Sequence, residues 1–574
     1  MLEDLDLSSI ADERARELIQ RLLNLLEGVM ADLRAAQAEN QRLRDEINRL
    51  KGEQGRPQVQ SNTPQPPPGD HSSEQERRKP KPWSKRCKTD RISIDRAQVV
   101  EVDRHGLPPD AVFKGYEDVV VQDIIFRTDN ILFHKEKWYA PSQRQSYLAP
   151  LPQGYTGQFG PGIKSLALTL YFGGQMSEPK IADLFRSVGV HISDGYLSNL
   201  LIKDQGAFHA EKAAVYQAGL ASSPWQHVDD TSTRVNGQNS YCHIVCNPLY
   251  TAYFTTESKD RLTILDVLTN HRPRRFLVNA EAVGFLEACG LSAIRRQQVA
   301  QLPGETLLDA MALQSLLDIH LPGLGPQQRK WIMDATAVAA SHAELEYPVV
   351  RLLVCDDAPQ FTLVTDELAL CWVHEGRHYK KLVPYVSHHR ALLEDFVQRF
   401  WMYYAQLLAY QTLPTPAEAA RLTGEFATLF ATVTGYAALD ERIAKTRTKQ
   451  GCLLMVLTHP EIPLHNHPAE LGARARVRKR DVSFGPRTRE GATAWDTFMT
   501  LAGTATKLGV SFYHYIHDRV SGAFQMPSLA NLIAFRREVR AAQEYAESGS
   551  GADAGGSRLQ AVVRLGLPLS PLTP

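Results

Sequence analysis

The chain has little of several features that would narrow its class. Its seven cysteines are few for 574 residues, odd in number and without a C-x-x-C pair, which argues against a disulfide framework and favours a reducing compartment. No apolar run reaches the roughly 18–20 residues that a membrane span needs. The acidic stretch MLEDLDLSS at the N-terminus is unlike a secretory signal. The sequence therefore predicts a cytoplasmic protein without a membrane-spanning segment.

The chain also lacks net charge, because 64 basic residues balance 64 acidic ones. A uniformly cationic surface is thereby excluded, so any nucleic acid must be bound by local basic patches. Such patches occur at residues 77–91 and 474–489. The length is too great for a single core, and we expect about two to four domains.

Residues 10–52 have the heptad pattern of a coiled coil. Two lines of residues form its seam: Ile19, Leu26, Leu33, Asn40 and Ile47, and Leu22, Val29, Ala36, Leu43 and Leu50. An asparagine on such a seam resembles the buried polar residue that fixes register in a parallel dimer. We expect a homodimer or higher oligomer through this helix. The alternative is that the helix packs on its own globular body.

The next segments predict a linker and two small units. Residues 53–91 are rich in Pro, Gln, Ser and Gly and then become basic, which suits either a DNA-tracking strand or a solvated linker. β-rich runs over residues 92–150 predict a small β module. Residues 151–210 predict a helix-turn-helix region, whose second helix is capped by Ser193. The alternative is a helical hairpin that binds no DNA. The expected DNA-reading side chains are Tyr196, Asn199 and Lys203.

Three acidic stretches organise the rest of the chain. Residues 224–235, PWQHVDDTSTRV, form a β-prone run in which the first strand is expected to end at 227–231, before a hairpin. Residues 352–361, LLVCDDAPQF, form a second apolar run that ends in two aspartates. Residues 465–479 carry a glutamate at the head of a basic segment. Strands that end in carboxylates are typical of an RNase H-like sheet. We therefore expect a multidomain α/β protein with an RNase H-like mixed-sheet core over residues 222–495.

The core is expected to contain helical insertions near residues 270–345 and 388–450, and a short strand at 368–374. C-terminal helices are expected at 496–541. The tail at 547–574 begins with a Gly/Ser/Ala-rich stretch that is typical of disorder.

Carboxylates in this pattern suit a two-metal site for phosphoryl transfer. Two divalent ions about 3.5–4 Å apart need hard oxygen ligands, and about three carboxylates suffice when water and phosphate oxygens complete the coordination. We choose Asp229 and Asp356 as ligands. Neighbouring strand residues point to opposite faces, so Asp230 and Asp357 are second choices.

Two further groups have open interpretations on residue pattern alone. Glu470 shares a helix face with Arg474 and Arg478, so it is either a ligand or part of a surface salt-bridge face. A C-x₂-H-x₃-H spacing could hold zinc, but no fourth ligand is evident in the sequence. The residues with this spacing are Cys371, His374 and His378.

The order of these motifs resembles the transposases of the insertion-sequence-66 family, which use a DDE carboxylate triad on an RNase H-like fold. HVDDT at 227–231 is similar to the family motif H-x-D-E-T, which implies that Asp229 is the first acid. CDDAPQF at 355–361 resembles D-G-Y-x-x-Y, which implies that Asp356 is the second.

Two later motifs extend the resemblance to most of residues 15–540. CWVHEGRHY at 371–379 looks like C-W-x-H-x-R-R-x-F, which implies a structural or DNA-contacting role rather than zinc binding. HNHPAELGARARVRK at 465–479 resembles D-N-N-x-x-E-x-x-x-R-x-x-x-R-K, which places the third acid at Glu470. The resemblance also implies that the basic side chains that follow it contact DNA: Arg474, Arg478 and Lys479.

The chain departs from the family pattern at several places. Residues 92–150 contain no cysteine, so the family's small zinc module is not expected. Aspartate replaces the family's glutamate at Asp230. Histidines at His465 and His467 replace the outer members of D-N-N, and only Asn466 remains to support the third acid. The insertion near 270–345 is longer than the family's usual link.

The resemblance implies a bacterial DNA transposase that requires Mg²⁺, with Mn²⁺ as a substitute. Its expected partners are the terminal inverted repeats of its own mobile element, target DNA and a second copy of the chain, with accessory proteins of the element left open. It would associate with the nucleoid when bound to DNA. The alternatives are a catalytically inactive DNA-binding relic, and an RNase H-like nuclease without strand transfer.

Overall fold

The structure is a computed structural model that describes residues 10–51, 92–103, 106–108, 111–304 and 306–547. The linker expected at 53–91 and the tail expected after residue 547 lie outside the described residues. Within the described ranges, no helix is both long enough and apolar enough to cross a bilayer.

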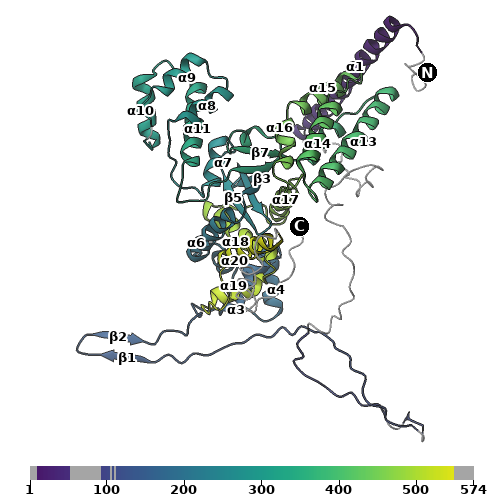
Figure 1. Ribbon diagram of the computed structural model, residues 1–574. Helices are drawn as coiled ribbons and strands as arrows, with labels where there is room; N and C mark the ends of the chain where they lie inside the picture. The colour runs from purple at the N-terminus through teal and green to yellow at the C-terminus, as the bar shows by residue number, and fades with distance from the viewer. Residues whose placement is uncertain (1–9, 52–91, 104–105, 109–110, 305, 548–574) are drawn as a thin grey trace.

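A five-stranded mixed sheet lies at the centre of the molecule, with the strand order β5-β4-β3-β6-β7 (Figure 1). Its strands are β3 (Trp225–Val235), β4 (Gln238–Asn247), β5 (Tyr250–Thr256), β6 (Leu352–Cys355) and β7 (Glu367–Leu370). β3, β4 and β5 are antiparallel neighbours, whereas β3, β6 and β7 run parallel. Asn236 and Gly237 connect β3 to β4 with positive φ angles of 50° and 77°, as a two-residue hairpin turn requires. The predicted mixed α/β sheet is confirmed.

Helix α18 (Arg489–Lys507) covers the outer edge of β5. Oxygens of the helix accept hydrogen bonds from alternate N–H groups of the strand: Thr504 from Thr251 at 3.3 Å, Thr500 from Tyr253 at 3.1 Å and Asp496 from Thr255 at 2.6 Å. An uncovered edge would leave these donors unpaired. The domain boundary expected at residue 495 falls inside this helix, because α18 completes the sheet.

Helices from both ends of the core sequence pack together beneath the sheet, as Figure 1 shows. α6 (Gly206–Ala221) contacts α18 and α20, and α19 contacts α3. The remaining elements of this group are α3 (Pro161–Leu168), the π-helix η4 (Thr169–Gly173), α4 (Glu178–Ser187), α5 (Asp194–Ile202), α19 (Phe512–Val520) and α20 (Leu529–Glu547).

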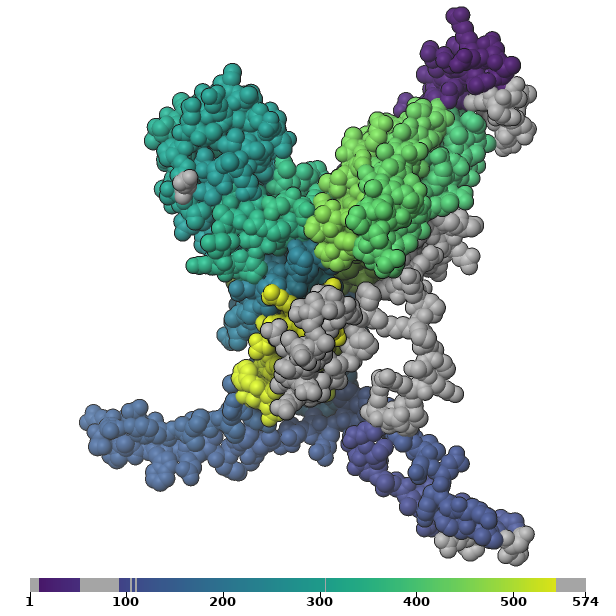
Figure 2. All heavy atoms as spheres, in the orientation of Figure 1, coloured from purple at the N-terminus to yellow at the C-terminus, as the bar shows by residue number. Residues whose placement is uncertain are grey.

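The first group of inserted helices lies between α7 and β6. α7 (Arg261–Leu268) precedes the group, whose elements are α8 (Ala280–Ala288), α9 (Ala293–Ala300), α10 (Ala310–His320) and α11 (Pro326–His342). Figure 2 shows these helices as a lobe that is separated by a hollow from a second lobe. A short 3₁₀ turn, η5 (Pro359–Phe361), follows β6.

The second lobe follows β7. It contains α12 (Trp372–Lys380), α13 (Ser387–Tyr410), α14 (Pro416–Leu429), α15 (Ala437–Arg447), α16 (Gln450–Leu453) and η6 (Met455–Leu457). Trp372 is fully buried at its centre, where it packs against Phe400, Tyr403, Tyr404 and Phe426. The chain then returns to the sheet through α17 (His467–Ser483), which contacts β3 and β4.

The long N-terminal helix predicted by the heptad pattern is present as α1 (Glu13–Leu50). Part of it packs on the chain's own body: the Glu27 carboxylate accepts hydrogen bonds from the backbone N–H groups of Tyr385 and Val386 at 2.8 and 2.7 Å. Leu23 is buried against Val386. Most of the seam faces solvent, including Leu22, Val29, Leu33, Leu43, Ile47 and Leu50.

The prediction of a small β module over residues 92–150 is wrong. The described residues between 92 and 136 contain no strand, and β1 (Lys137–Ala140) pairs only with β2 (Gln145–Leu148) in a hairpin that projects from the body (Figures 1 and 2). Apolar side chains here are exposed; Val100 and Ile125 are each 83% accessible. A β-rich composition forms a sheet only where side chains find a surface to pack on, and a lone hairpin offers none.

Candidate active site

Asp229 lies on β3, and Asp356 immediately follows the last residue of the neighbouring parallel strand β6. β3 and β6 pair with Trp225 opposite Leu352 and His227 opposite Val354, and the same register two residues further places Asp229 next to Asp356. β3 does not end at residue 231 as expected but continues to Val235, because β4 pairs with it along this whole stretch. The first acid therefore projects from a rigid strand rather than from a turn.

Burial raises the pKa of both aspartates, and Asp356 also disfavours the ionised form of Asp229. Burial and the neighbouring Asp356 raise the pKa of Asp229 to about 7, and Glu470 contributes in the same direction. Burial also raises the pKa of Asp356, although His374 partly offsets this effect. Partly buried carboxylates that repel one another are poised to bind a cation.

Glu470 lies in the first turn of α17 and contacts two basic side chains of α12. His374 Nε2 is 3.3 Å from one carboxylate oxygen, and Arg377 Nη2 is 3.1 Å from the other. Burial opposes ionisation, but these contacts outweigh it and hold the pKa of Glu470 below its usual range. His374 was expected on a strand at 368–374; that prediction is wrong, because β7 ends at Leu370 and α12 begins at Trp372.

The contacts of His374 and Arg377 with Glu470 were missed by sequence reasoning, which left the role of the CWVHEGRHY motif open. The signal was their i, i+3 spacing, which puts two basic side chains on one helix face. The same motif also stabilises the second lobe. Its Trp372, which lies between the cysteine and the histidine, donates its indole N–H to Leu453 O at 2.8 Å there.

Asn466 joins β3 and the start of α17, which carry two of the acids, to the junction of β7 with α12. Its side chain is fully buried; its amide nitrogen donates to Val228 O at 2.7 Å and its amide oxygen lies 2.9 Å from His227 Nδ1. Its backbone N–H donates to the Cys371 thiol sulfur at 3.2 Å. The one retained residue of the D-N-N block therefore ties the start of α17 to β3 and to the junction of β7 with α12.

A glycine allows α17 to lie close to the sheet. A Cβ added at Gly472 would sit 2.7 Å from the Ile244 Cγ2 methyl of β4, which is closer than van der Waals contact. This close approach fixes the height of Glu470 above the strands, since both residues belong to the same helix.

The two second-choice acids have other partners. Asp230 accepts a hydrogen bond from Gln360 at 2.6 Å and lies 3.3 Å from Lys259 Nζ. Asp357 is paired with Lys449 in the second lobe. Both are therefore charge-compensated. Asp230 follows Asp229 on β3, so its side chain points to the opposite face of the sheet.

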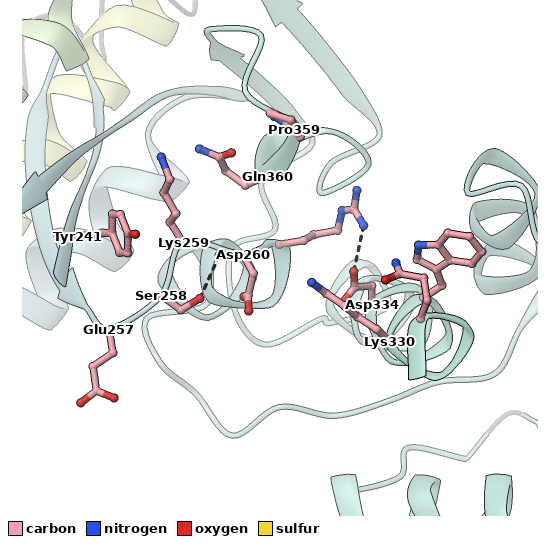
Figure 3. Close-up of a pocket in the computed structure, with 12 residues that line it drawn as sticks. Tyr241, Glu257, Ser258, Lys259, Asp260, Lys330, Asp334, Pro359 and Gln360 are labelled. Carbon is pink, nitrogen blue, oxygen red and sulfur yellow. Dashed lines mark hydrogen bonds and ion pairs between the residues drawn. The ribbon is translucent and has the colours of Figure 1, made fainter. Parts of the chain in front are cut away.

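A cavity of about 550 Å³ has Lys259 and Gln360 in its wall, next to Asp230 (Figure 3). It lies between the core and the first lobe, and α11 contributes Lys330 to it. Arg261 of α7 and Asp334 of α11 form an ion pair of 3.0 Å across this junction. The charges that line the cavity balance, because Lys259, Arg261 and Lys330 face it together with Glu257, Asp260 and Asp334.

The basic residues of α17 divide into two sets. Arg474 and Arg478 are exposed, as a contact with DNA requires. Lys479, which was expected to contact DNA, is fully buried, and that prediction is wrong. Its ammonium donates to Tyr171 O at 2.6 Å and to Met176 O at 3.2 Å, and lies 3.2 Å from the centre of the Tyr171 ring. Lys479 therefore anchors α17 to η4.

The helix-turn-helix region contains α4 and α5, joined by a turn in which Gly189 has a φ of 81°. The Ser193 hydroxyl caps α5 by accepting a hydrogen bond from Tyr196 N at 3.3 Å. Tyr196 is half-buried because its ring packs on Phe159 at a centroid distance of 4.8 Å. Asn199 and Lys203 are exposed and available to a ligand.

The ligand types at the site suit a divalent cation, but within the described residues the three carboxylates do not form a group whose oxygens all lie within 4.8 Å of one another. Asp229, Asp356 and Glu470 offer only hard carboxylate oxygens, the ligand type that Mg²⁺ and Mn²⁺ prefer. A zinc site at the C-x₂-H-x₃-H motif is not supported: Cys371 accepts a backbone hydrogen bond, His374 contacts Glu470, and His378 does not join them in a metal-sized cluster within the described residues.

Comparisons with known proteins agree with this geometry. The model described as "Transposase IS66 family" matches residues 156–278, which contain the helix-turn-helix region, β3 to β5 and Asp229. An uncharacterized protein of Sinorhizobium fredii, y4jO, is 30% identical over 303 residues, which are 53% of this chain and 94% of that relative. No solved structure matches. The chain therefore carries an IS66 family transposase domain over residues 156–278.

Proposed function

We propose that this chain is the transposase of a bacterial insertion sequence, which binds the terminal inverted repeats of its element, cuts the DNA there and joins the 3′-hydroxyl ends to target DNA. The observation that carries the proposal is the convergence of Asp229, Asp356 and Glu470 from β3, β6 and α17. The strand order, an antiparallel meander extended by two parallel strands, supports an RNase H-like core.

Each acid has a defined position in this proposal. Two divalent cations held by the three carboxylates would activate the attacking oxygen and stabilise the leaving oxygen of the phosphodiester. β3 and β6 hold Asp229 and Asp356 in fixed register, and Asn466 holds the start of α17 against them. Arg474 and Arg478 follow Glu470 on an exposed face of α17, where they would bind backbone phosphates.

The test is an assay of cleavage and strand transfer with the purified full chain, labelled DNA of the element's end and Mg²⁺. We expect Asp229→Asn, Asp356→Asn and Glu470→Gln to abolish both products while leaving DNA binding nearly intact. The matched control is Asp357→Asn, because this acid adjoins Asp356 but is paired with Lys449 and should keep its activity.

The outcomes separate the competing functions. Cleavage without joined product would indicate a nuclease of the same fold. Specific binding of the repeat by the wild-type chain, without cleavage even when the element's accessory proteins are added, would indicate an inactive DNA-binding relic. Activity that survives Asp229→Asn would refute the assigned triad.

Recognition of the repeat is proposed to depend on α5, which presents Asn199 and Lys203 to solvent. Tyr196 would contact DNA only with the part of its ring that Phe159 leaves uncovered. Lys203→Ala should weaken binding for any sequence and reduce the salt slope by about 1, whereas Asn199→Ala should relax sequence preference. Equal slopes for Lys203→Ala and wild type would remove Lys203 from the interface.

Pairing of two chains is proposed to use the exposed seam of α1, with its buried face retained on the body. Leu43 is 55% accessible although it is a seam leucine, and a second copy would cover it. Leu43→Lys should reduce the mass measured by light scattering towards that of a monomer. Ala38→Lys, on the exposed outer face of the same helix, is the control and should leave the mass unchanged.

A further inference from the structure

A histidine and two acids converge where the first lobe meets the sheet. Glu281 lies in the first turn of α8, His342 is the last residue of α11, and Asp366 immediately precedes β7. One ligand atom from each lies within 4.8 Å of the other two. Among the residues that the structure describes, they form the one such group of three, and none belongs to the proposed active site.

The orientation of His342 is fixed by its surroundings. Its side chain is only 6% accessible, and Nε2 lies 3.0 Å from Val364 O. A carbonyl oxygen can only accept, so Nε2 carries the hydrogen. Nδ1 then faces both carboxylates: it is in contact with Glu281 Oε1 and lies 3.2 Å from Asp366 Oδ1.

This arrangement needs a cation between the three groups. In the neutral imidazole, the Nδ1 lone pair would point at two negatively charged oxygens, which is repulsive. Arg351 relieves only part of this charge, because it binds the other oxygen of Asp366 at 3.0 Å and the backbone carbonyl of His342 at 2.8 Å. Either a second proton on His342 or a metal ion would make the cluster attractive.

We propose that Glu281, His342 and Asp366 bind a divalent transition-metal ion, Zn²⁺ in the first instance, that clips the first lobe to the core. A metal-bound histidine usually donates its other ring N–H to a carbonyl or carboxylate, as His342 does to Val364. Ligand bonds of about 2.0–2.1 Å in tetrahedral geometry put ligand atoms about 3.3 Å apart, close to the separation of Nδ1 and Asp366 Oδ1. Glu281 Oε1 is in direct contact with Nδ1, so this exposed side chain would have to move outward to admit the ion.

The ligand set selects the class of metal. One imidazole nitrogen with two carboxylates suits zinc or manganese, whereas calcium and magnesium prefer oxygen alone. Glu281 and Asp366 are 42% and 45% accessible, so water can complete the coordination. The site joins α8 and α11 to β7, the strand that leads into α12 and its Glu470 contacts. The inference is independent of the proposed DNA chemistry.

The experiment uses the full chain with Asp229→Asn and Asp356→Asn, which removes two ligands of the other candidate metal site. This parent is titrated with Zn²⁺ by calorimetry, and its thermal unfolding is measured with and without Zn²⁺. We expect one equivalent of bound zinc and a higher unfolding temperature. Adding Glu281→Gln or Asp366→Asn should weaken binding at least about tenfold and remove the thermal shift.

A matched control is Glu287→Gln, which neutralises a different acid of α8 that pairs with Arg296 and should leave zinc binding unchanged. Both test residues are partly exposed, so these variants should fold even if His342→Gln does not. Absence of zinc binding in the parent would overturn the proposal. An equivalent of zinc that Glu281→Gln and Asp366→Asn both leave unaffected would also overturn it.

Discussion

Asn466→Ala should destabilise the core by more than the few atoms it removes would suggest. The substitution removes two side-chain hydrogen bonds and leaves Val228 O and His227 Nδ1 without partners in a site where His227 is 1% accessible. An unsatisfied buried polar group costs about 1–3 kcal/mol, so we expect a loss of about 2–6 kcal/mol. Burial holds the pKa of His227 down at about 3, so the ring is neutral at ordinary pH and the loss should not depend on pH there.

The loss can be measured by equilibrium urea unfolding followed by tryptophan fluorescence, because buried Trp225 begins β3 and its ring packs against the His227 ring. The matched control is Asn531→Ala, which removes an exposed asparagine of α20 and should change stability by less than about 0.5 kcal/mol. DNA cleavage should fall together with stability, because Asn466 also starts the helix that carries Glu470. If Asn466→Ala were no less stable than Asn531→Ala, the role assigned to this asparagine would be refuted.

Three further outcomes follow from α17 and its neighbours. Burial lowers the pKa of Lys479 to about 7, so above that pH the unfolded chain binds more protons than the folded one. The free energy of unfolding of the wild type should therefore rise, relative to Lys479→Met, by up to about 1.4 kcal/mol per pH unit from pH 7 towards 10. Parallel pH profiles of the two proteins in urea unfolding would contradict this. Gly472→Ala should cost about 1–3 kcal/mol by forcing α17 off β4, whereas Gly424→Ala, with open space around it, should be neutral or stabilising. Arg377→Met should tighten Mn²⁺ binding in calorimetry, because Glu470 loses a cation that competes with the metal. The gain should be no more than about fivefold, since Arg377 is 45% exposed. Weaker binding would show that Arg377 does not compete with the metal.

The positions of Asp229 and Asp356 could be predicted from the sequence because the local patterns around them match the strands of the sheet. An apolar run before Asp356 and an alternating run around Asp229 each produced a strand, and the Asn-Gly pair produced its hairpin turn. The length of β3 was not accessible, since pairing with β4 decides it. Likewise, Cys371 looked like part of a strand, but it caps α12, because Trp372 turns inward to the second lobe.

The predictions for Lys479 and for residues 92–150 failed because they relied on composition rather than on helical periodicity or on a surface to pack against. Lys479 was grouped with a basic run, although the buried face of α17 recurs every three or four residues through Ala469, Gly472, Ala473, Arg476 and Lys479. The small residues on this face, Ala469, Gly472 and Ala473, were the available signal that it is buried. The β-rich runs of residues 92–150 carry no comparable signal, since nothing in their composition shows whether a second layer exists to cover them.

Helix α17 also connects the central sheet to the helix-turn-helix region. Glu470 stands near one end among the strands, and Lys479, nine residues later, is bonded to η4 beside the helix-turn-helix region. At a rise of 1.5 Å per residue, the two lie about 14 Å apart along a continuous helix. A displacement of α4 and α5 relative to the sheet would therefore be transmitted to Glu470 with little slack. Any ligand that shifts these helices would also shift the Glu470 carboxylate.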